Sequence, residues 1–447
     1  MFRFPWLISR RKLIFNSLSE IILIFLLNKY FLFNYLVFTS NIEIFTLTFI
    51  PFWLLFSYIF GRYSYDDLVA ENNNFIIFLK LYFASIFTIL ISILFVFTIS
   101  YNINLNNYNH YDKAIISYSI LSTFAINFLQ FPLVYRLIKN ASKNEKWIFI
   151  GSNQLFSLIT NELKWSRKKI KLIYKDLDYD FSNLKLDNIK GIFFDNLDEI
   201  NLENLLIFER RGIKFMNIEK WCQNYLQRLP LDLLSSKYLI KGNFKIYEKT
   251  FQLRIKRIGD LILSLILLVF TSPLILIAGL LIYLEDRKNI FYMQERVGIN
   301  QTHFTLYKLR TMKSNAENGQ AKWSTLNDKR VTRIGKFLRK SRLDELPQLI
   351  CVIRGEMSLI GPRPEREVFD SELKKIIPFY SSRYFVKPGL SGWAQVNYPY
   401  GASIDDSKKK LSYDLYYLKN FSVWLDFLIL FKTIRMVFLR RGSLPNN

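Results

Sequence analysis

Ser341-Arg342-Leu343-Asp344-Glu345-Leu346-Pro347-Gln348 places two adjacent carboxylates inside a strongly basic part of the chain. One carboxylate of such a pair can attack phosphorus as a nucleophile, while its neighbour holds a divalent cation and nearby cations bind phosphate. Cationic neighbours lower the pKa of a carboxyl group, so we expect the nucleophile to be ionised at neutral pH. Taken alone, the pair also fits a solvated helix face with ion pairs. The surrounding cations are Lys329, Arg330, Arg333, Lys336, Arg339, Lys340, Arg342, Arg354 and Arg363.

Three further stretches lie in the same part of the chain. They are DKRVTRIGKFLRK at residues 328–340, GEMSLIGPRPE at residues 355–365 and KPGLSGWAQV at residues 387–396. Together with the carboxylate pair, these motifs resemble the bacterial sugar transferase domain, over about residues 251–439. Proteins of this family are monotopic phosphoglycosyl transferases that start lipid-linked polysaccharide assembly.

The resemblance implies a two-step transfer. Asp344 would attack the β-phosphate of a UDP-sugar, UMP would leave, and undecaprenyl phosphate would take the sugar phosphate from the aspartyl intermediate. Mg²⁺ would sit beside Glu345, since Mg²⁺ usually has few protein ligands. The product would begin an exopolysaccharide, a capsule or an O-antigen. The alternative is a non-catalytic membrane scaffold of a polysaccharide assembly complex, which would not need both Asp344 and Glu345.

Four other residues are candidates for the site. Two prolines fix the backbone on both sides of Arg363, which aims its planar guanidinium and suits a diphosphate, although a rigid surface turn has the same pattern. Lys308 and Arg310 follow an alternating strand pattern and are either phosphate ligands or exposed strand cations. Asp414 belongs to a family-like motif, YDLYY, and either supports the site or has a structural role.

The composition indicates a membrane protein with basic cytoplasmic parts. The 447 residues are 51% hydrophobic, and 61 Lys and Arg against 37 Asp and Glu give a formal charge of +24. Anionic lipid and phosphate-bearing substrates are therefore expected partners, and nucleic acid is not. Two cysteines and two histidines make a disulfide framework, a histidine metal site or a histidine triad improbable. The resemblance leaves a homodimer open.

Residues 1–140 predict four membrane helices. The apolar stretches cover residues 13–38, 45–60, 75–100 and 114–134, and each is near the length that crosses a hydrocarbon core. Lys and Arg cluster before the first stretch and after the fourth, which predicts a multi-pass protein of the bacterial inner membrane with a cytoplasmic catalytic domain.

Residues 145–240 predict a Rossmann-like module, similar to a CoA-binding domain. Short buried strands alternate with a helical pattern, which favours a small parallel α/β domain. Gly151 stands alone where a dinucleotide fingerprint needs three glycines, so a structural or regulatory role and a bound nucleotide both remain open.

Residues 250–447 form the expected catalytic domain, of mixed α/β fold, and begin with the apolar stretch 258–284. Ser272 and Pro273 lie near its middle, and basic residues flank both ends. A crossing helix would carry the basic remainder outside, so we expect a re-entrant helix that breaks at Ser272-Pro273; a fifth span is the alternative. Near the chain end, residues 424–439 are expected to form a helix that lies in the headgroup plane or packs on the soluble core.

Overall fold

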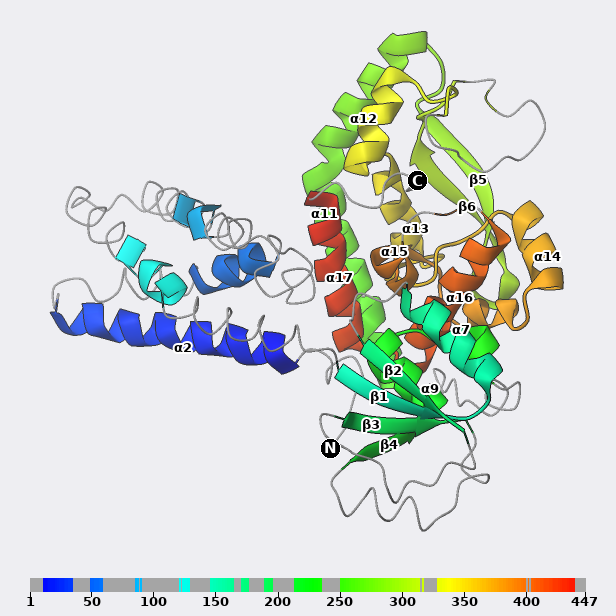
Figure 1. Ribbon diagram of the computed structural model, residues 1–447. Helices are drawn as coiled ribbons and strands as arrows, with labels where there is room; N and C mark the ends of the chain where they lie inside the picture. Colours follow the sequence, from blue (N-terminus) through cyan, green and yellow to red (C-terminus); the bar gives the residue numbers. More distant parts are fainter. Residues whose placement is uncertain are drawn as a thin grey trace. The chain divides into compact units, whose positions relative to one another are not determined.

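The computed structural model describes residues 11–34, 49–58, 85–87, 89–90, 120–121, 123–128, 145–164, 170–176, 189–195, 213–234, 250–313, 316, 328–398, 401 and 403–438 (Figure 1). The chain divides into two compact units, and the boundary between them falls in the sequence between Met216 and Asn217. This division comes earlier than the expected start of the catalytic part at residue 250. The units are described one at a time.

The first unit contains apolar helices near its amino terminus. Helix α2 spans Arg11–Asn34, and a second helix spans Phe49–Tyr58. Ile24, Trp53 and Ile126 belong to one buried cluster, and Trp53 Nε1 donates a 2.7 Å hydrogen bond to Glu20 Oε2. The carboxylate that interrupts the first apolar stretch is therefore a buried hydrogen-bond acceptor. Of the third and fourth expected spans, only helical pieces between residues 85 and 90 and between 120 and 128 are described, so the four-span arrangement stays a prediction.

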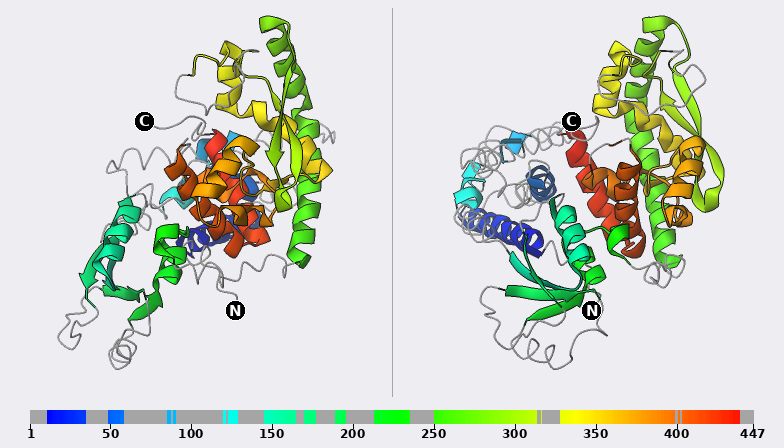
Figure 2. Two further views of the ribbon diagram at one scale, coloured as in Figure 1. Left: turned by 90° about the vertical axis from the view of Figure 1, so that its right-hand side faces the viewer. Right: turned by 45° about the vertical axis from the view of Figure 1, so that its right-hand side comes forward.

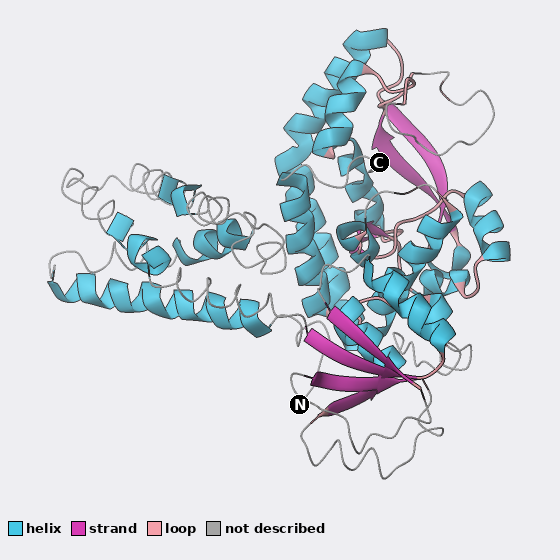
Figure 3. Cartoon of the chain, in the orientation of Figure 1, coloured by secondary structure: helices cyan, strands magenta, loops and turns pink. Residues whose placement is uncertain are grey.

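The first unit also contains a parallel sheet, drawn in magenta in Figure 3, whose strands lie in the order β2-β1-β3-β4 (labelled in Figure 1). The strands are β1 Glu145–Ile150, β2 Ile170–Lys175, β3 Ile189–Phe194 and β4 Lys214–Asn217, and helix α7 spans Asn153–Lys164. Strand β1 pairs in parallel with both β2 and β3. The predicted parallel sheet is confirmed for the described strands. The alternating pattern also includes residues 205–209, which lie outside the described residues.

The second unit is built around the long helix α11, Thr250–Asp286 (Figure 2). The segment before it holds α9 Ile218–Trp221, the π-helix η1 Cys222–Leu226 and the 3-10 turn η2 Leu231–Leu233. After α11 come β5 Phe291–Val297, η4 Ile299–Gln301, β6 His303–Leu309, α12 Arg333–Ser341, η5 Leu343–Gln348, α13 Leu349–Arg354, β7 Ser358–Ile360, α14 Glu367–Ile376, η6 Tyr380–Phe385, β8 Gly389–Ser391, α15 Trp393–Asn397, α16 Ile404–Lys419 and α17 Val423–Phe438. Strands β5 and β6 form an antiparallel hairpin, and β7 pairs in parallel with β8.

Helix α11 remains helical through Ser272 and Pro273, so the chain is not interrupted there, and the bend expected at this pair stays a prediction. Proline lacks the backbone N–H that would donate to the carbonyl four residues earlier, which is Val269 O. The Ser272 hydroxyl donates to Val269 O instead, at 2.8 Å. A neighbouring hydroxyl can therefore satisfy the carbonyl that the proline leaves without a donor, as happens in membrane helices.

Both ends of α11 pack against the same catalytic unit. Near the amino end, Lys256 donates to Ile360 O and Arg257 donates to Val352 O. Near the carboxyl end, Ala278 and Ile282 pack with residues of β6 and α12. Between and beside these anchors the helix exposes large apolar side chains, such as Phe270 at 78% and Leu276 at 73%. Within the described part of the chain, α11 is the helix long and apolar enough to cross a membrane.

Helix α17 has two different faces. Leu425 and Ile429 are buried in the core, whereas Trp424, Phe427 and Phe438 are exposed. The expected packing on the core is therefore confirmed for one face, and a place in the headgroup plane stays a prediction for the other, which presents an aromatic surface.

We predict that Ser272→Ala destabilises the protein by about 1 kcal/mol, because Val269 O then loses its donor. In a Pro273→Ala background the same change should have little effect, since residue 273 then supplies an N–H. Thr271→Val is the matched control: its hydroxyl donates to Leu267 O, which the N–H of residue 271 also faces in the helix. Apparent unfolding temperatures in detergent or nanodiscs measure this, and an equal loss in both backgrounds would contradict it.

Candidate active site

The carboxylate pair lies in η5, directly after α12. Thr332 caps the start of α12 by accepting a hydrogen bond from Gly335 N, and the helix ends at Arg342, whose φ of 59° turns the chain. Asp344 and Glu345 follow at once and are only 7% and 9% exposed. Leu343 packs against the cluster that contains Ala278 and Ile282 of α11. The carboxylates are therefore buried beside the long apolar helix, not on a solvated face.

Three cations from separate parts of the unit meet at Glu345. Its Oε1 accepts hydrogen bonds from Arg363 Nη2 at 2.7 Å, Lys308 Nζ at 3.4 Å and Arg342 Nη1 at 3.5 Å. The structure thus brings together Asp344, Glu345, Lys308 and Arg363, as the sequence suggested. Arg310 points to another partner, because its guanidinium pairs with Asp286 at the end of α11.

The two neighbouring carboxyl groups have opposite pKa shifts. Burial alone would raise the pKa of Glu345, but the three cations outweigh it and hold that pKa well below its usual value. Burial, followed by the charge of Glu345, raises the pKa of Asp344 to about 6 against the opposing effect of nearby cations. The cations do lower the pKa of Asp344, as predicted, but burial and the charge of Glu345 outweigh them, so the net shift is upward. The cations are hydrogen-bonded to Glu345, and burial decides the pKa of Asp344.

Asp344 retains an unused acceptor. Its Oδ1 is buried and has no hydrogen-bond partner among the described residues. A pKa of about 6 still leaves this carboxylate mostly ionised at neutral pH. An ionised oxygen that water and hydrogen bonds do not stabilise is a stronger nucleophile than a solvated one. Burial also disfavours the charged form of Lys308, and it lowers the pKa of that side chain to about 8.

The donor set fits a divalent cation only with help from a substrate or water. All three hydrogen bonds to Glu345 fall on Oε1, and Asp344 Oδ1 is unpartnered among the described residues, so oxygen atoms of the pair remain for a metal. No group of three or more metal-ligating side chains occurs within the described ranges. This fits Mg²⁺, which keeps several waters and commonly uses one or two carboxylates plus substrate phosphates.

The segment that carries Arg363 is held by its backbone carbonyls. Gly389 N donates to Pro362 O at 2.8 Å, Arg383 Nη2 donates to Arg363 O at 2.7 Å, and Arg296 Nη1 donates to Pro364 O at 3.2 Å. Each carbonyl in this run of three thus has a donor from a different part of the unit. The prolines fix the local backbone, and these donors fix its position.

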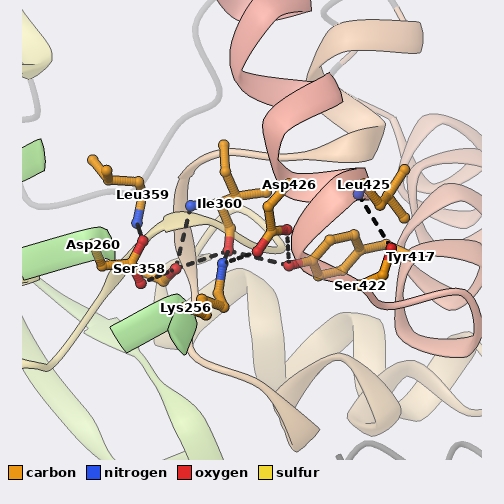
Figure 4. A network of polar contacts seen from close by, with 9 residues as sticks. All are labelled: Lys256, Asp260, Ser358, Leu359, Ile360, Tyr417, Ser422, Leu425 and Asp426. Carbon is orange, nitrogen blue, oxygen red and sulfur yellow. Dashed lines mark hydrogen bonds and ion pairs between the residues drawn. The ribbon is translucent and has the colours of Figure 1, made fainter. Parts of the chain in front are cut away.

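A second polar network anchors the strand that leads into this segment (Figure 4). Lys256 Nζ binds both Ile360 O at 2.9 Å and Asp426 Oδ2 at 2.6 Å. Asp260 accepts from Ser358 Oγ at 2.7 Å. The amino-terminal part of α11 is therefore hydrogen-bonded to β7, only a few residues before Arg363.

Asp414 is 2% exposed and pairs with Arg383, with Oδ2 3.3 Å from Nη2. Burial raises the pKa of Asp414 to about 6, and Arg383 opposes that shift. The residue lies one layer behind the carboxylate pair, through Arg383 and Arg363. Sequence patterns do not single out Arg383, Arg296 and Lys256, because the chain has many cations and only burial distinguishes these three. Asp260 is likewise recognised only by its burial and its hydrogen bonds.

A buried carboxylate pair, surrounded by cations and packed on an apolar helix, suits a transferase that handles phosphorylated substrates at a membrane. The bacterial sugar transferase family model matches residues 251–440. A UDP-glucose:undecaprenyl-phosphate glucose-1-phosphate transferase of Caulobacter vibrioides is 36% identical over 181 residues, which cover 40% of this chain and 68% of that protein. The chain belongs to the bacterial sugar transferase family.

Two longer relatives match over the same region. A UDP-N-acetylgalactosamine-undecaprenyl-phosphate N-acetylgalactosaminephosphotransferase of Aeromonas hydrophila is 47% identical over 189 residues, 42% of this chain and 45% of that protein. A UDP-glucose:undecaprenyl-phosphate glucose-1-phosphate transferase of Xanthomonas campestris is 39% identical over 181 residues, 40% of this chain and 37% of that protein. The match therefore spans less than half the length of these two relatives.

The opposite pKa shifts predict opposite effects on stability. The pKa of Asp344 is raised from 3.8 to about 6, so folding becomes less favourable as pH rises through this window. Asp344→Asn should therefore stabilise the protein at pH 7.5 by up to about 3 kcal/mol, with little gain near pH 4. The pKa of Glu345 is lowered, so its stabilisation is present above the unfolded pKa and Glu345→Gln should destabilise at pH 7.5. Chemical denaturation at both pH values tests this, and destabilisation by Asp344→Asn at pH 7.5 would contradict it.

Proposed function

We propose that this protein transfers a sugar 1-phosphate from a UDP-sugar to undecaprenyl phosphate and releases UMP. The observation that carries the proposal is the buried Asp344–Glu345 pair, which lies under Arg363 and Lys308 and beside α11. The names of the relatives agree in the acceptor and differ in the sugar, so the sugar of this chain is left to experiment.

In the first step, Asp344 attacks the β-phosphorus of the donor. A bond forms between a carboxylate oxygen and phosphorus, and the bond from that phosphorus to the bridging oxygen breaks. UMP leaves with the bridging oxygen and its electron pair, and an aspartyl phosphosugar remains. Arg363 and Lys308 bind the phosphate oxygens, exchanging part of their contact with Glu345 for the donor.

In the second step, a phosphate oxygen of undecaprenyl phosphate attacks the same phosphorus. The bond to Asp344 breaks, the carboxylate is regenerated, and the product is undecaprenyl diphosphate sugar. The apolar surface of α11 supports this step, because Leu343, next to the nucleophile, packs on that helix. A lipid tail can thus stay in the membrane while its phosphate reaches Asp344.

Mg²⁺ is a further proposal. Glu345, with Asp344 beside it, would hold the ion together with donor phosphates. When bound, Mg²⁺ would offset the phosphate charge that the cations leave uncompensated. EDTA should then lower UMP release at least about tenfold, and added Mg²⁺ should restore it; unchanged release in EDTA would remove the metal from the proposal.

We also propose that α11 enters and leaves the membrane on the cytoplasmic face of a multi-pass protein. Its two ends bind the same catalytic unit, through Lys256 at one end and Ile282 at the other, which disfavours a crossing. A membrane scaffold without activity is the weaker alternative, because a buried Asp344 whose Oδ1 has no hydrogen-bond partner in the described part of the chain opposes folding, and a scaffold gains nothing from it.

UMP release from a panel of UDP-sugars, with undecaprenyl phosphate and Mg²⁺, tests the proposed reaction. We expect one donor to give lipid-dependent release, and Asp344→Asn to reduce it by at least about a thousandfold, as for loss of a nucleophile. Asp328→Asn is the control, since its carboxylate pairs with Arg330.

Three results would count against the proposal. Release that survives Asp344→Asn would assign the nucleophile to another residue. UMP release that does not require the lipid would indicate hydrolysis of the donor instead of transfer to undecaprenyl phosphate. No release with any donor, from protein that is folded by its unfolding transition, would favour the scaffold.

A further inference from the structure

Arg383 is a buried cation that the proposed reaction does not use directly. Its side chain is 8% exposed, and it binds three groups. Nη2 donates to Arg363 O at 2.7 Å and lies 3.3 Å from Asp414 Oδ2, while Nη1 donates to the Tyr380 hydroxyl. One end of Arg363 is therefore held by Arg383, and the other end reaches Glu345 at 2.7 Å.

The position of Arg363 depends on outside donors. Pro362 and Pro364 lack backbone N–H groups, so at these positions the segment cannot anchor itself by donating hydrogen bonds. Its anchors must be donors to its carbonyls, and Arg383 is the donor at Arg363 itself. A small shift of this carbonyl would move the guanidinium that faces the substrate.

Asp414 explains why a guanidinium can be buried at this place. Asp414 is fully enclosed in the middle of α16, and its carboxylate is the anion beside Arg383. Without Asp414, Arg383 would lose this ion pair and keep only the weaker attraction of Glu365 and Asp370, which favours movement of the buried side chain toward water. Asp414 thus keeps Arg383 on the Arg363 carbonyl.

We propose that Asp414 and Arg383 are positioning residues that set the affinity of the donor site for a diphosphate by fixing Arg363. The inference deepens the proposed function, because it rests on Arg363 binding the donor phosphates. It assigns both residues a role through Arg363 and no contact with the substrate.

A double-mutant cycle on full-length protein in nanodiscs tests this, with inorganic pyrophosphate as the probe and calorimetry as the readout. Asp414→Asn should weaken binding about tenfold when Arg363 is present. In an Arg363→Lys background, which keeps the charge and loses the planar fork, the same change should weaken binding less than about threefold. Arg383→Lys should resemble Asp414→Asn, and Asp414→Glu should recover part of the affinity.

Asp328→Asn is the matched control, because Asp328 is also a mostly buried carboxylate, with Oδ2 2.6 Å from Arg330 Nη2. It should leave pyrophosphate affinity within about twofold. Equal losses from Asp414→Asn in both backgrounds would overturn the inference, as would a comparable loss in Asp328→Asn or no binding by the wild type. Unfolding temperatures of every variant separate lost positioning from lost folding.

The outcome is independent of the proposed reaction. Non-additive pyrophosphate binding together with no UMP release from any UDP-sugar would support the positioning pair and reject the proposed function. UMP release together with additive losses of pyrophosphate affinity would support the proposed function and reject the positioning pair.

Discussion

The catalytic unit depends on one electrostatic constraint, which is the removal of two adjacent carboxylates from water. Two negative charges in a poorly solvated place repel each other and favour protonation. The two carboxylates differ in how their charge is compensated. Three cations bind Glu345, and Asp344 keeps a buried oxygen without a partner among the described residues. Glu345 thereby holds the three cations in place, and Asp344 keeps an acceptor oxygen.

The cations in turn need a rigid frame, since a mobile arginine would simply neutralise Asp344. Polar contacts from several elements supply that frame at the backbone of residues 360–364. Lys256 of α11, Gly389 of β8 and Arg383 of η6 each donate to a carbonyl in this run. The frame therefore links the amino-terminal part of the apolar helix to Arg363 within a few residues of chain.

Sequence patterns identified the parts of the site that lie on recognisable motifs. Asp344, Glu345, Lys308 and Arg363 were predicted and do converge, because each stands in a stretch with its own constraint, such as the prolines around Arg363. The pattern of short apolar runs likewise predicted the parallel sheet of the first unit.

What failed depends on distances that a sequence does not contain. The pKa of Asp344 was assigned from the number of nearby cations, whereas burial and the choice of Glu345 as their partner decide it. The sequence placed Arg310 beside Lys308, and only the structure shows that Arg310 pairs with Asp286. Helix α11 stays continuous at Pro273, where the Ser272 hydroxyl donates to the carbonyl that the proline leaves without a donor.

The segment before α11 has a consequence for how such proteins are assembled from modules. Gln227 O accepts from Trp393 Nε1 at 2.8 Å, and Leu229 N donates to Ser412 O at 2.8 Å, although the family match begins only at residue 251. An exchange of amino-terminal halves between relatives, if joined at the edge of the family match, would strip the buried indole of Trp393 of its acceptor. A junction before Asn217 would keep the segment that precedes α11 together with the catalytic unit.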